Sequence, residues 1–535
     1  MKFVLLGCVV TMDAASTVLP NGAIYVDGNT IVAAADRAAP TPPGFSGATS
    51  VDTGGFIYPG LIELHNHLSY DALPLWDVPK RFSNRGQWQS NRDYVAHVSG
   101  PMGTIAKSND PHLLAAVVRY VETKCLLGGV TTSQGISLKG DHLETYYHSA
   151  MRVVDDPADK KFPRAATHIP DIAAANWDSF KREIDKSSCL LLHLSEGLDA
   201  QARDAFLALK KGREWAIGPA LAGIHCAALQ REDFAVMAAK GASMVWSPLS
   251  NLLLYGGTAD VKAARQEGVP VALGSDWSPS GSKNLLHELK VAKVVNGVNG
   301  LGVSDLSLVA SVTSAPAAVV KWDKLIGSIT AGKRADFTVI AAAAGADPYD
   351  RLIAAAETDV VLVVIEGRPV VGTPALMSAL GQSGETLRVG AAQRVIDYGP
   401  GDPRIPKMTF AQAEAALSDA LKRLPTLLDD EHAGHGVTGR LTADAPARHL
   451  RLALDEEHQS GFALRPRLPF AGEPTGPDAE PALALAIEAA ATPLPLKPLK
   501  LDALSVADDP EYGSRLQHAA NIPAAIKDGL KAFYR

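Results

Sequence analysis

The middle of the chain alternates short apolar runs with amphipathic stretches, and this alternation limits the possible folds most strongly. Six runs predict strands: Ile57–Leu64, Val130–Gly135, Leu190–His193, Ala220–His225, Ser243–Ser247 and Val269–Ser275. Candidate helices lie between them: His112–Leu127, Trp177–Lys186, Leu198–Lys211, Arg231–Lys240 and Thr258–Gln266. Such alternation is typical of parallel α/β sheets, and residues 57–320 approach the ~250 residues of a (β/α)8 TIM-like barrel. Arg164–His168 and Met151–Val154 are weaker strand candidates, so we expect distortion at barrel strands 3 and 4.

Both flanks of this region predict small β units. Phe3–Val10 is a β-branched, apolar run, and Asp27-Gly28-Asn29 is a hairpin turn signal. The same pattern returns at Ala335–Ile340 and around Glu366-Gly367-Arg368. We therefore expect residues 1–56 and 321–375 to form one composite β-sandwich domain, with the barrel of residues 57–320 inserted between them.

Residues 376–535 form a C-terminal extension in which we find no motif that indicates chemistry. Thr409–Leu424 predicts an amphipathic helix whose capping-box residues are Thr409 and Gln412. Eight prolines within residues 466–498 indicate an extended segment that wraps a surface. We interpret His432 and His435 as surface residues rather than ligands. We expect the extension to cover the barrel or to form a subunit interface.

Polar side chains follow four of the predicted strands. His65-Asn66-His67 comes directly after the first run, and residues i and i+2 of a strand point to the same side. His193 and His225 end two later runs, and Asp276 follows the last one. Because the active sites of such barrels lie at the carboxyl ends of their strands, we expect these side chains to meet there.

Each motif alone has a plainer explanation. His225 could be a buried core histidine, and Asp276 could be a helix cap or turn residue. Glu196 follows His193 at an offset of three, which in a regular strand would place it on the opposite face. The chain must therefore turn after His193 if Glu196 is to face the same site. The coincidence of four motifs at four strand ends favours a functional site.

The composition excludes several other classes of protein. The chain has 535 residues, of which 47% are hydrophobic and 20% charged, unlike a disordered chain or a disulfide miniprotein. Its net charge of −7 argues against binding of nucleic acid or of an anionic membrane. The four cysteines form no C-x-x-C pair, as expected of a reduced cytoplasmic protein, and no apolar run reaches the ~20 residues of a membrane helix. We interpret Met1–Cys8 as a strand rather than a lipoprotein signal, because its apolar stretch is too short.

As a set, these motifs resemble the amidohydrolase superfamily, in particular its mononuclear-metal branch of cytosine deaminase and triazine hydrolase-like enzymes. The resemblance covers residues 1–375 and includes the segments Tyr58–Ile62, Leu73–Trp76, Ser247–Asn251 and Ile326–Asp336. It implies that one divalent metal ion, zinc or alternatively iron, binds to His65, His67, His193 and Asp276. It also implies catalytic roles for Glu196, His225 and Asp276. For His168 we favour a structural or substrate-facing role over that of an extra ligand.

The resemblance implies a hydrolase that activates water on the metal for attack on an sp² carbon. Hydrolytic deamination of a nitrogen heterocycle is the expected reaction, with Glu196 as proton shuttle. Hydrolysis of a cyclic or linear amide, or dechlorination, is the alternative, and a non-catalytic scaffold protein is a remote one. Aromatic and polar residues around the expected site could bind a planar, nitrogen-containing small molecule: Trp76, Trp88, Arg92, Asn251 and Trp277. We expect a homo-oligomer.

Overall fold

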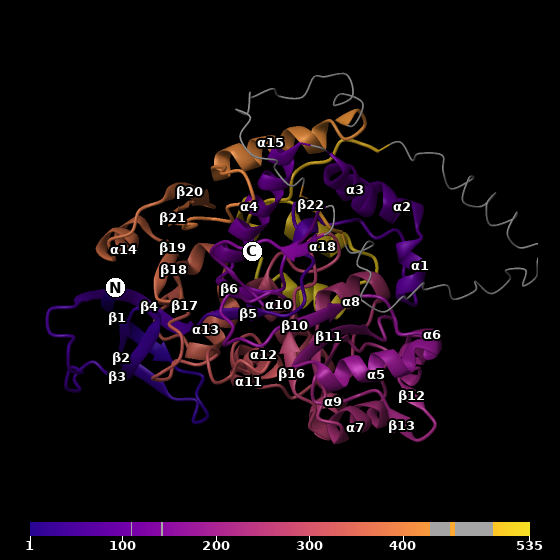
Figure 1. Ribbon diagram of the computed structural model, residues 1–535, viewed down its shortest axis with the longest axis horizontal. Coiled ribbons are helices and arrows are strands. Elements are labelled where there is room, and N and C mark those ends of the chain that lie inside the picture. Colours follow the sequence, from indigo (N-terminus) through magenta and orange to yellow (C-terminus); the bar gives the residue numbers. More distant parts are fainter. Residues whose placement is uncertain (109, 141–142, 428–449, 455–495, 535) are drawn as a thin grey trace, which may run out of the picture.

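The computed structural model describes residues 1–108, 110–140, 143–427, 450–454 and 496–534. It contains two β structures of different kinds (Figure 1). A nine-stranded sheet, antiparallel except at one pairing, contains the N-terminal strands at the left of Figure 1. Shorter strands with parallel pairings occupy the centre and are accompanied by helices.

Both flanks of the chain contribute to the nine-stranded sheet. In spatial order it consists of β20 (Glu385–Val389), β21 (Ala392–Ile396), β19 (Arg368–Gly372), β18 (Val360–Ile365), β17 (Phe337–Ala341), β4 (Thr49–Pro59), β1 (Lys2–Val10), β2 (Val18–Asp27) and β3 (Thr30–Asp36). The two flanks meet where β17 pairs antiparallel with β4. The β18–β19 hairpin turns through Glu366 and Gly367, whose φ angles of +52° and +69° suit a tight two-residue turn. The pairing of the flanks is therefore as expected.

The strands of both flanks belong to one continuous hydrogen-bonded sheet, and its arrangement as a β-sandwich stays a prediction. Side chains of β1 alternate between two apolar clusters, with Phe3 and Leu5 in one cluster and Val4 and Leu6 in the other. Each face of the single sheet thus has its own apolar cover. The sheet also continues beyond residue 375, because the β20–β21 hairpin of the C-terminal extension pairs with β19.

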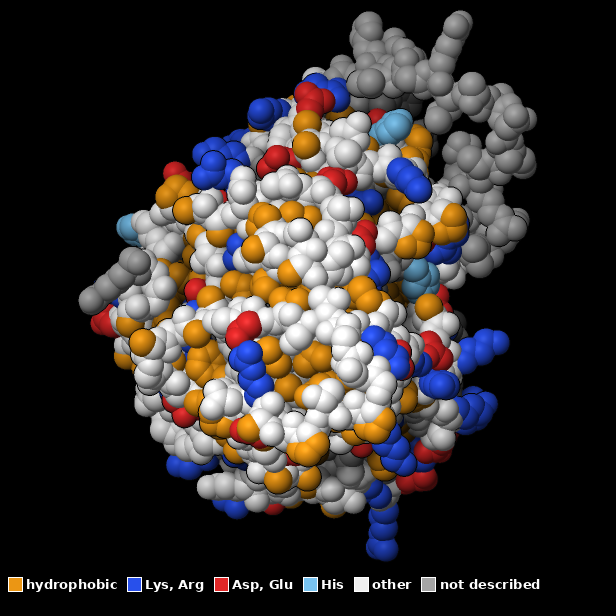
Figure 2. Space-filling view, turned by 90° about the vertical axis from the view of Figure 1, so that its left-hand side faces the viewer, with side chains coloured by type: hydrophobic (Ala, Val, Ile, Leu, Met, Phe, Trp, Pro, Cys, Tyr) orange, Lys and Arg blue, Asp and Glu red, His pale blue; other side chains and the backbone are white. Residues whose placement is uncertain are grey.

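On the face of the molecule shown in Figure 2, apolar side chains gather towards the middle, with most charged side chains nearer the edges.

Eight short strands follow the βα pattern of the sequence. They are β5 (Leu61–Glu63), β6 (Val130–Ser133), β9 (Arg152–Val153), β10 (Ala165–His168), β11 (Cys189–Leu194), β14 (Leu221–His225), β15 (Ser243–Trp246) and β16 (Val271–Leu273). They form two parallel sheets with the orders β5-β6-β9 and β10-β11-β14-β15-β16. The predicted strand Ile57–Leu64 is divided, since its first residues complete β4. At the division Gly60 packs so closely that a Cβ atom would lie 2.2 Å from the Thr131 hydroxyl.

Backbone hydrogen bonds connect the two parallel sheets. The N–H of Ala165 donates to the carbonyl of Val154, at 2.9 Å, and so joins the start of β10 to the end of β9. Asn66 and Asp276 form a parallel bridge on the other side. There the N–H of Asp276 donates to His65, at 2.8 Å, and the N–H of His67 donates to Asp276, at 3.1 Å. These bonds place the residues that follow β5 beside those that follow β16.

The helices between these strands lie largely where the sequence predicts them. Four agree with the predicted ranges: α4 (Pro111–Leu127), α5 (Trp177–Lys186), α7 (Arg231–Ala239) and α9 (Val261–Glu267). The last three lie outside strands β10 to β16 in Figure 1. The predicted helix Leu198–Lys211 is too long, because α6 (Ala200–Leu207) gives way to a hairpin of β12 (Lys210–Lys211) and β13 (Glu214–Trp215). Further helices are α8 (Pro248–Tyr255), α10 (Leu285–Asn299), α11 (Asp305–Ala310), α12 (Ser314–Val319), α13 (Pro348–Ala354) and α14 (Pro374–Ala379).

The loop that follows β5 carries α1 (Arg85–Gln89), α2 (Arg92–Tyr94) and α3 (Gly100–Lys107). The helices of the described residues include none that is both long and apolar enough to cross a membrane.

The C-terminal extension packs against the rest of the molecule at several places. Its helix α15 (Phe410–Lys422) has the predicted capping box and stacks Phe410 on Tyr120 of α4, with ring centroids 5.7 Å apart. Strand β22 (Arg451–Leu452) pairs with β7 (Ser137–Gly140), which forms a hairpin with β8 (Leu143–Tyr146). Two terminal helices follow, α18 (Tyr512–His518) and α19 (Ala524–Leu530). His432, His435 and most of the proline-rich segment lie outside the described residues.

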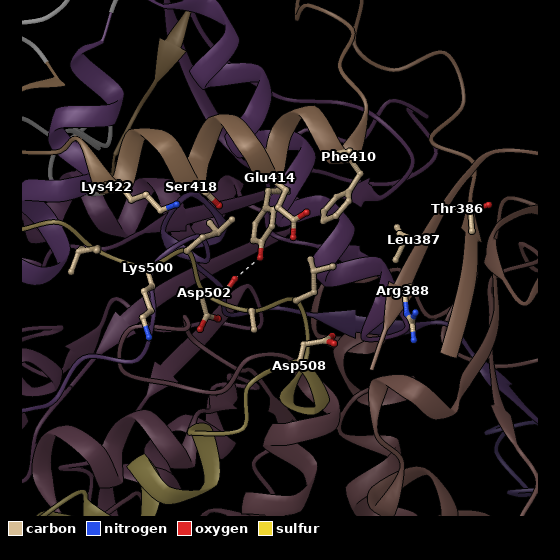
Figure 3. Close-up of a pocket in the computed structure, with 16 residues that line it drawn as sticks. Thr386, Leu387, Arg388, Phe410, Glu414, Ser418, Lys422, Lys500, Asp502 and Asp508 are labelled. Atoms are coloured by element: carbon tan, nitrogen blue, oxygen red, sulfur yellow. Dashed lines mark hydrogen bonds between the residues drawn. The ribbon is translucent and has the colours of Figure 1, made fainter. Parts of the chain in front are cut away.

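A buried carboxylate fastens the end of this extension to the loops after β5 and β16. Asp502 lies on the segment that crosses beneath α15 in Figure 3. It accepts hydrogen bonds from Nζ of Lys124 and Nζ of Lys283, each at 2.6 Å, and all three side chains are at most 2% exposed. Lys124 also donates to the carbonyl of Asp71 and to the hydroxyl of Ser278. The extension therefore supplies the counter-ion of two buried lysines.

Candidate metal centre

Three imidazole nitrogens and one carboxylate oxygen meet where β5, β11 and β16 end. Nε2 of His65 lies 3.1 Å from Nε2 of His193, which in turn lies 3.2 Å from Nε2 of His67. Oδ1 of Asp276 lies 3.5 Å from Nε2 of His65 and 3.4 Å from Nε2 of His67. The four residues expected to bind the metal are thus brought together.

The chemistry of this cluster fits a divalent cation. Burial lowers the pKa of His65 and that of His193 well below the usual range, so both rings are neutral at pH 7. Nδ1 of His65 lies 2.6 Å from the Ser247 hydroxyl; when it donates there, Nε2 presents a lone pair to the cluster. Nε2 of His193 lies 3.1–3.2 Å from Nε2 of His65 and from Nε2 of His67, close enough for one cation to bind all three nitrogens. Three imidazoles and a carboxylate are also ligands that zinc takes in proteins.

His225 lies beside this cluster, but the ring nitrogen that faces the cluster, Nε2, carries a proton. Nδ2 of Asn251 donates to Nδ1 of His225 at 3.0 Å, and Oδ1 of Asn251 accepts a bond from the Thr258 hydroxyl at 3.1 Å. The neutral ring therefore carries its proton on Nε2, which lies 3.6 Å from Glu196 and 4.0 Å from Asp276. Burial lowers the pKa of His225 to about 4 and so favours this neutral form. Although Nε2 is close to His65 and His193, a protonated nitrogen is a donor rather than a ligand.

Glu196 faces the same site because the chain turns after His193, as the sequence requires. Ser195 has a φ angle of +52°, which breaks the alternation of the strand. Oε1 of Glu196 accepts a hydrogen bond from the Tyr255 hydroxyl at 2.7 Å. Oε2 lies 3.6 Å from Nε2 of His225 and 3.7 Å from the guanidinium of Arg85. One carboxylate oxygen is thus fixed by Tyr255, and the other faces the histidine.

Strained backbone is concentrated at these strand ends. Eight described residues other than glycine have a positive φ, and four of them lie here: Ser195, His225, Cys226 and Asp276. Such conformations cost about 1–3 kcal/mol each and persist where the surroundings impose them, often at functional sites. Two of these four residues, His225 and Asp276, are also expected to take part in catalysis.

The loop after β5 covers the site with aromatic and charged side chains. Nε1 of Trp88 donates to the Tyr255 hydroxyl at 2.7 Å, so Trp88 supports the residue that holds Glu196. Trp277 lies with its ring centroid 5.1 Å from that of His67 and 6.1 Å from that of Trp88. The buried guanidinium of Arg85 lies near Glu196 and donates to the carbonyl of Ile169 at 2.6 Å.

Three of the residues expected to contact the substrate are exposed or have partners within the protein. Arg92 is exposed at the start of α2, and the arginine beside Glu196 is Arg85. Trp76 stacks on Phe82 and donates to Asp93 at 2.7 Å, so its contacts lie within the loop. Asn251 is fully buried and supports His225.

Several residues of the site had no role predicted for them, namely Tyr255, Ser247 and Thr258. Ser247 directly follows β15 and so lies at a strand end, which is a signal that could have indicated it. Tyr255 ends α8, and Arg85 begins α1 in the long loop. His168 ends β10 near Arg85, and burial lowers its pKa to about 4, but it does not share either metal-binding group found in the described residues.

Comparison with known proteins identifies the family of the chain. The profile of the amidohydrolase family matches residues 56–370, which is more than half of the chain. The 5-methylthioadenosine/S-adenosylhomocysteine deaminase of Symbiobacterium thermophilum is 25% identical over 412 residues, 68% of this chain and 91% of that protein. The 5'-deoxyadenosine deaminase of Methanothermobacter thermautotrophicus is 23% identical over 360 residues, 60% of this chain and 80% of that protein.

Solved structures share the fold. A crystal structure of an adenosine deaminase from Xanthomonas campestris with bound zinc superposes with a TM-score of 0.58 at 18% identity, covering 79% of this chain and 99% of that one. The chain belongs to the amidohydrolase family and is a hydrolase of carbon–nitrogen bonds other than peptide bonds.

Proposed function

We propose that this protein hydrolytically deaminates a nitrogen heterocycle, and that its substrates are aminopurine nucleosides of the adenosine type. The observation that carries the proposal is the convergence of His65, His67, His193 and Asp276, with Glu196 beside them. The names of the two relatives above, both deaminases of adenosine derivatives, support the substrate class.

The eight parallel strands form, in this proposal, one closed (β/α)8 barrel. The bonds from Ala165 to Val154 and from Asp276 to His65 support closure, since they connect the two parallel sheets on both sides. The site then lies at the carboxyl end of the barrel, where such barrels carry their active sites.

The four converging side chains would hold one divalent ion, with zinc as the proposed metal. Bound there, the ion supplies Lewis-acid activation of water. Asp276 would hold the ion through Oδ1, which faces the imidazoles, and its Oδ2, which lies 4.0 Å from Nε2 of His225, would be the base that takes a proton from the attacking water. His225 orients the water and the substrate through Nε2–H, and Asn251 fixes the direction of that bond from behind.

Glu196 transfers the second proton. Oε1 is engaged by Tyr255, so Oε2 is the oxygen that gives a proton to the ring nitrogen of the substrate and recovers one from the hydroxyl that the water has added to the carbon. The proton taken up by Asp276 passes to the amino group, which leaves as ammonia when its bond to the carbon breaks. The nearby guanidinium of Arg85 stabilises the carboxylate of Glu196 after it has given up its proton. Trp88 and Trp277 exclude water from one side of the site and offer faces for a planar ring.

An ammonia-release assay on the zinc-loaded full chain tests the proposal. Its substrates would be adenosine, 5'-deoxyadenosine, 5-methylthioadenosine, S-adenosylhomocysteine, guanine and cytosine. We expect ammonia from at least one adenosine derivative, loss of that activity with a chelator and its recovery with zinc. Failure to release ammonia from any of the six, with turnover of cyclic amides or chlorinated triazines instead, would assign the site to amide hydrolysis or dechlorination.

A further inference from the structure

A second group of buried polar side chains lies away from the metal centre, around the first turns of α10. These residues line a cavity of about 610 Å³ between α10, the end of α13 and the C-terminal segment with α18 and the residues after α19. Cavities of this size accommodate small-molecule ligands. The cavity in Figure 3 is similar in volume, about 640 Å³, but its lysines and arginine are exposed side chains of the kind common on any surface.

The first observation that points to an anionic ligand is the environment of Lys290. Its side chain is only 4% exposed, and Nζ donates to the carbonyls of Leu286 and Ala355. Among the described residues no carboxylate lies within 4 Å of it. Buried lysines are nearly always paired with an anion, because an isolated ammonium loses its hydration. Burial lowers the pKa of Lys290 to about 8, despite the longer-range influence of Glu357 and Asp359.

His287 and Tyr534 offer two further polar atoms. Nδ1 of His287 accepts hydrogen bonds from the Tyr512 hydroxyl at 2.9 Å and from the N–H of Lys283 at 3.4 Å. The neutral ring therefore carries its proton on Nε2, and this buried N–H has no acceptor within the described residues. The hydroxyl of Tyr534, whose ring packs 5.2 Å from that of His287, likewise has no partner in the described part of the chain.

The carboxylates that line the cavity are already engaged. Oε1 of Glu357 accepts bonds from Asn284 at 2.7 Å and from the N–H of Val506 at 3.2 Å. Asp509 pairs with Lys283 at 3.0 Å. The residues that line the cavity therefore include an ammonium group, an imidazole and a phenol whose N–H and hydroxyl are buried without a partner among the described residues, and the apolar ring of Phe533, whose centroid lies 6.0 Å from Nζ of Lys290.

We propose that this cavity is a binding site for a small anionic molecule, a carboxylate or a phosphate ester with an apolar part. The oxygens of the anion accept from Lys290, His287 and Tyr534, and the apolar part packs on Phe533. The site is separate from the metal centre, and the proposal does not depend on the reaction that the centre catalyses.

Thermal unfolding of the metal-loaded full chain tests this, with benzoate and phenyl phosphate as probes and sodium chloride at equal ionic strength as reference. We expect one or both probes to raise the unfolding midpoint of the protein with a saturable dependence on concentration. A response to benzoate alone identifies the carboxylate class, and a response to phenyl phosphate alone identifies the phosphate class. Equal midpoints in probe and chloride for both would overturn the proposal.

Three variants show whether the probe binds in this cavity. Lys290→Met keeps the volume of the side chain and should weaken binding about 10-fold or more, whereas Lys293→Met, on the outer side of the same helix where Lys293 pairs with Asp305, should not change it. Ala354→Trp blocks the cavity from an exposed position and should also abolish the shift, even if Lys290→Met does not fold. Unchanged probe affinity in Ala354→Trp would place the anion elsewhere and contradict the proposal.

Discussion

Glu196 is the residue whose replacement separates catalysis from metal binding. In Glu196→Gln the amide cannot carry a proton on the position of Oε2, while the four metal ligands are untouched. We expect kcat to fall about 10²–10⁴-fold or more and the metal content to stay that of the wild type. Ammonia release and elemental analysis of the same preparation measure both. Glu214→Gln, at an exposed residue of β13, is the matched control and should be fully active. Wild-type turnover by Glu196→Gln would remove the proton transfer from this residue.

Ser247 is expected to affect metal affinity without binding the metal, because it contacts the ligand His65. Its hydroxyl lies 2.6 Å from Nδ1 of His65, and loss of such support lowers metal affinity about 10–100-fold in known sites. We expect this loss in Ser247→Ala, measured by competition for zinc with a chelator. Ser250→Ala is the control, because Ser250 is equally buried on α8 but its hydroxyl has no partner among the described residues. If the two variants bind zinc equally, His65 is oriented by packing alone.

At the scale of single residues, the side chains at the strand ends could be predicted from the sequence. The residues that hold those side chains in place could not. The two-residue period of a strand places His65 and His67 on one side, and the C-terminal ends of parallel strands lie together. Tyr255 and Arg85 lie on a helix and in a loop, where only the tertiary packing decides what each side chain reaches. The same reason explains Arg92, which no local pattern distinguishes from Arg85 as the arginine of the site.

At the scale of elements, the segment around Asp502 should contribute strongly to stability. Asp502→Asn leaves the ammonium groups of Lys124 and Lys283 buried with half of their acceptor charge gone. Breaking a buried ion pair on one side costs about 3–5 kcal/mol, so we expect a clearly lower midpoint in urea and in heat. Asp528→Asn removes an exposed pair with Lys531 and should change the free energy of unfolding by about 0.5 kcal/mol or less. Equal midpoints for the two variants would mean that the buried lysines lose their protons at little cost.

The positions of strands along the chain were easier to predict than the pairing of strands in sheets. The short apolar runs predicted the strands, including β9 and β10, because buried parallel strands are nearly continuous in apolar residues. The continuity of the nine-stranded sheet could not be predicted, since the alternation along a strand does not show which strands pair. The contribution of β20 and β21 was missed because pairing between distant segments leaves no local signal.

At the scale of the whole molecule, the C-terminal extension is an integral part of the structure. A chain that ends at Gly372 loses the hairpin that pairs with β19, the cover of Tyr120 by α15 and the counter-ion of Lys124 and Lys283. We expect this chain to aggregate or to lose its metal, as judged by size-exclusion chromatography and elemental analysis.

A second truncated chain, which ends at Asp397, distinguishes the contribution of the β20–β21 hairpin from that of the rest of the extension. It keeps β20 and β21 but lacks both Asp502 and the residues that cover Lys124 and Lys283, which are 1% exposed in the full chain. We expect it to fail like the shorter chain, because the lost contacts support the loops that follow His67 and Asp276. If it is monodisperse and active while the Gly372 chain is not, the hairpin alone provides the stabilising contact. If both chains keep activity and the oligomeric state of the full chain, the extension is dispensable for the site, and the ion cluster around Asp502 stabilises only the extension itself.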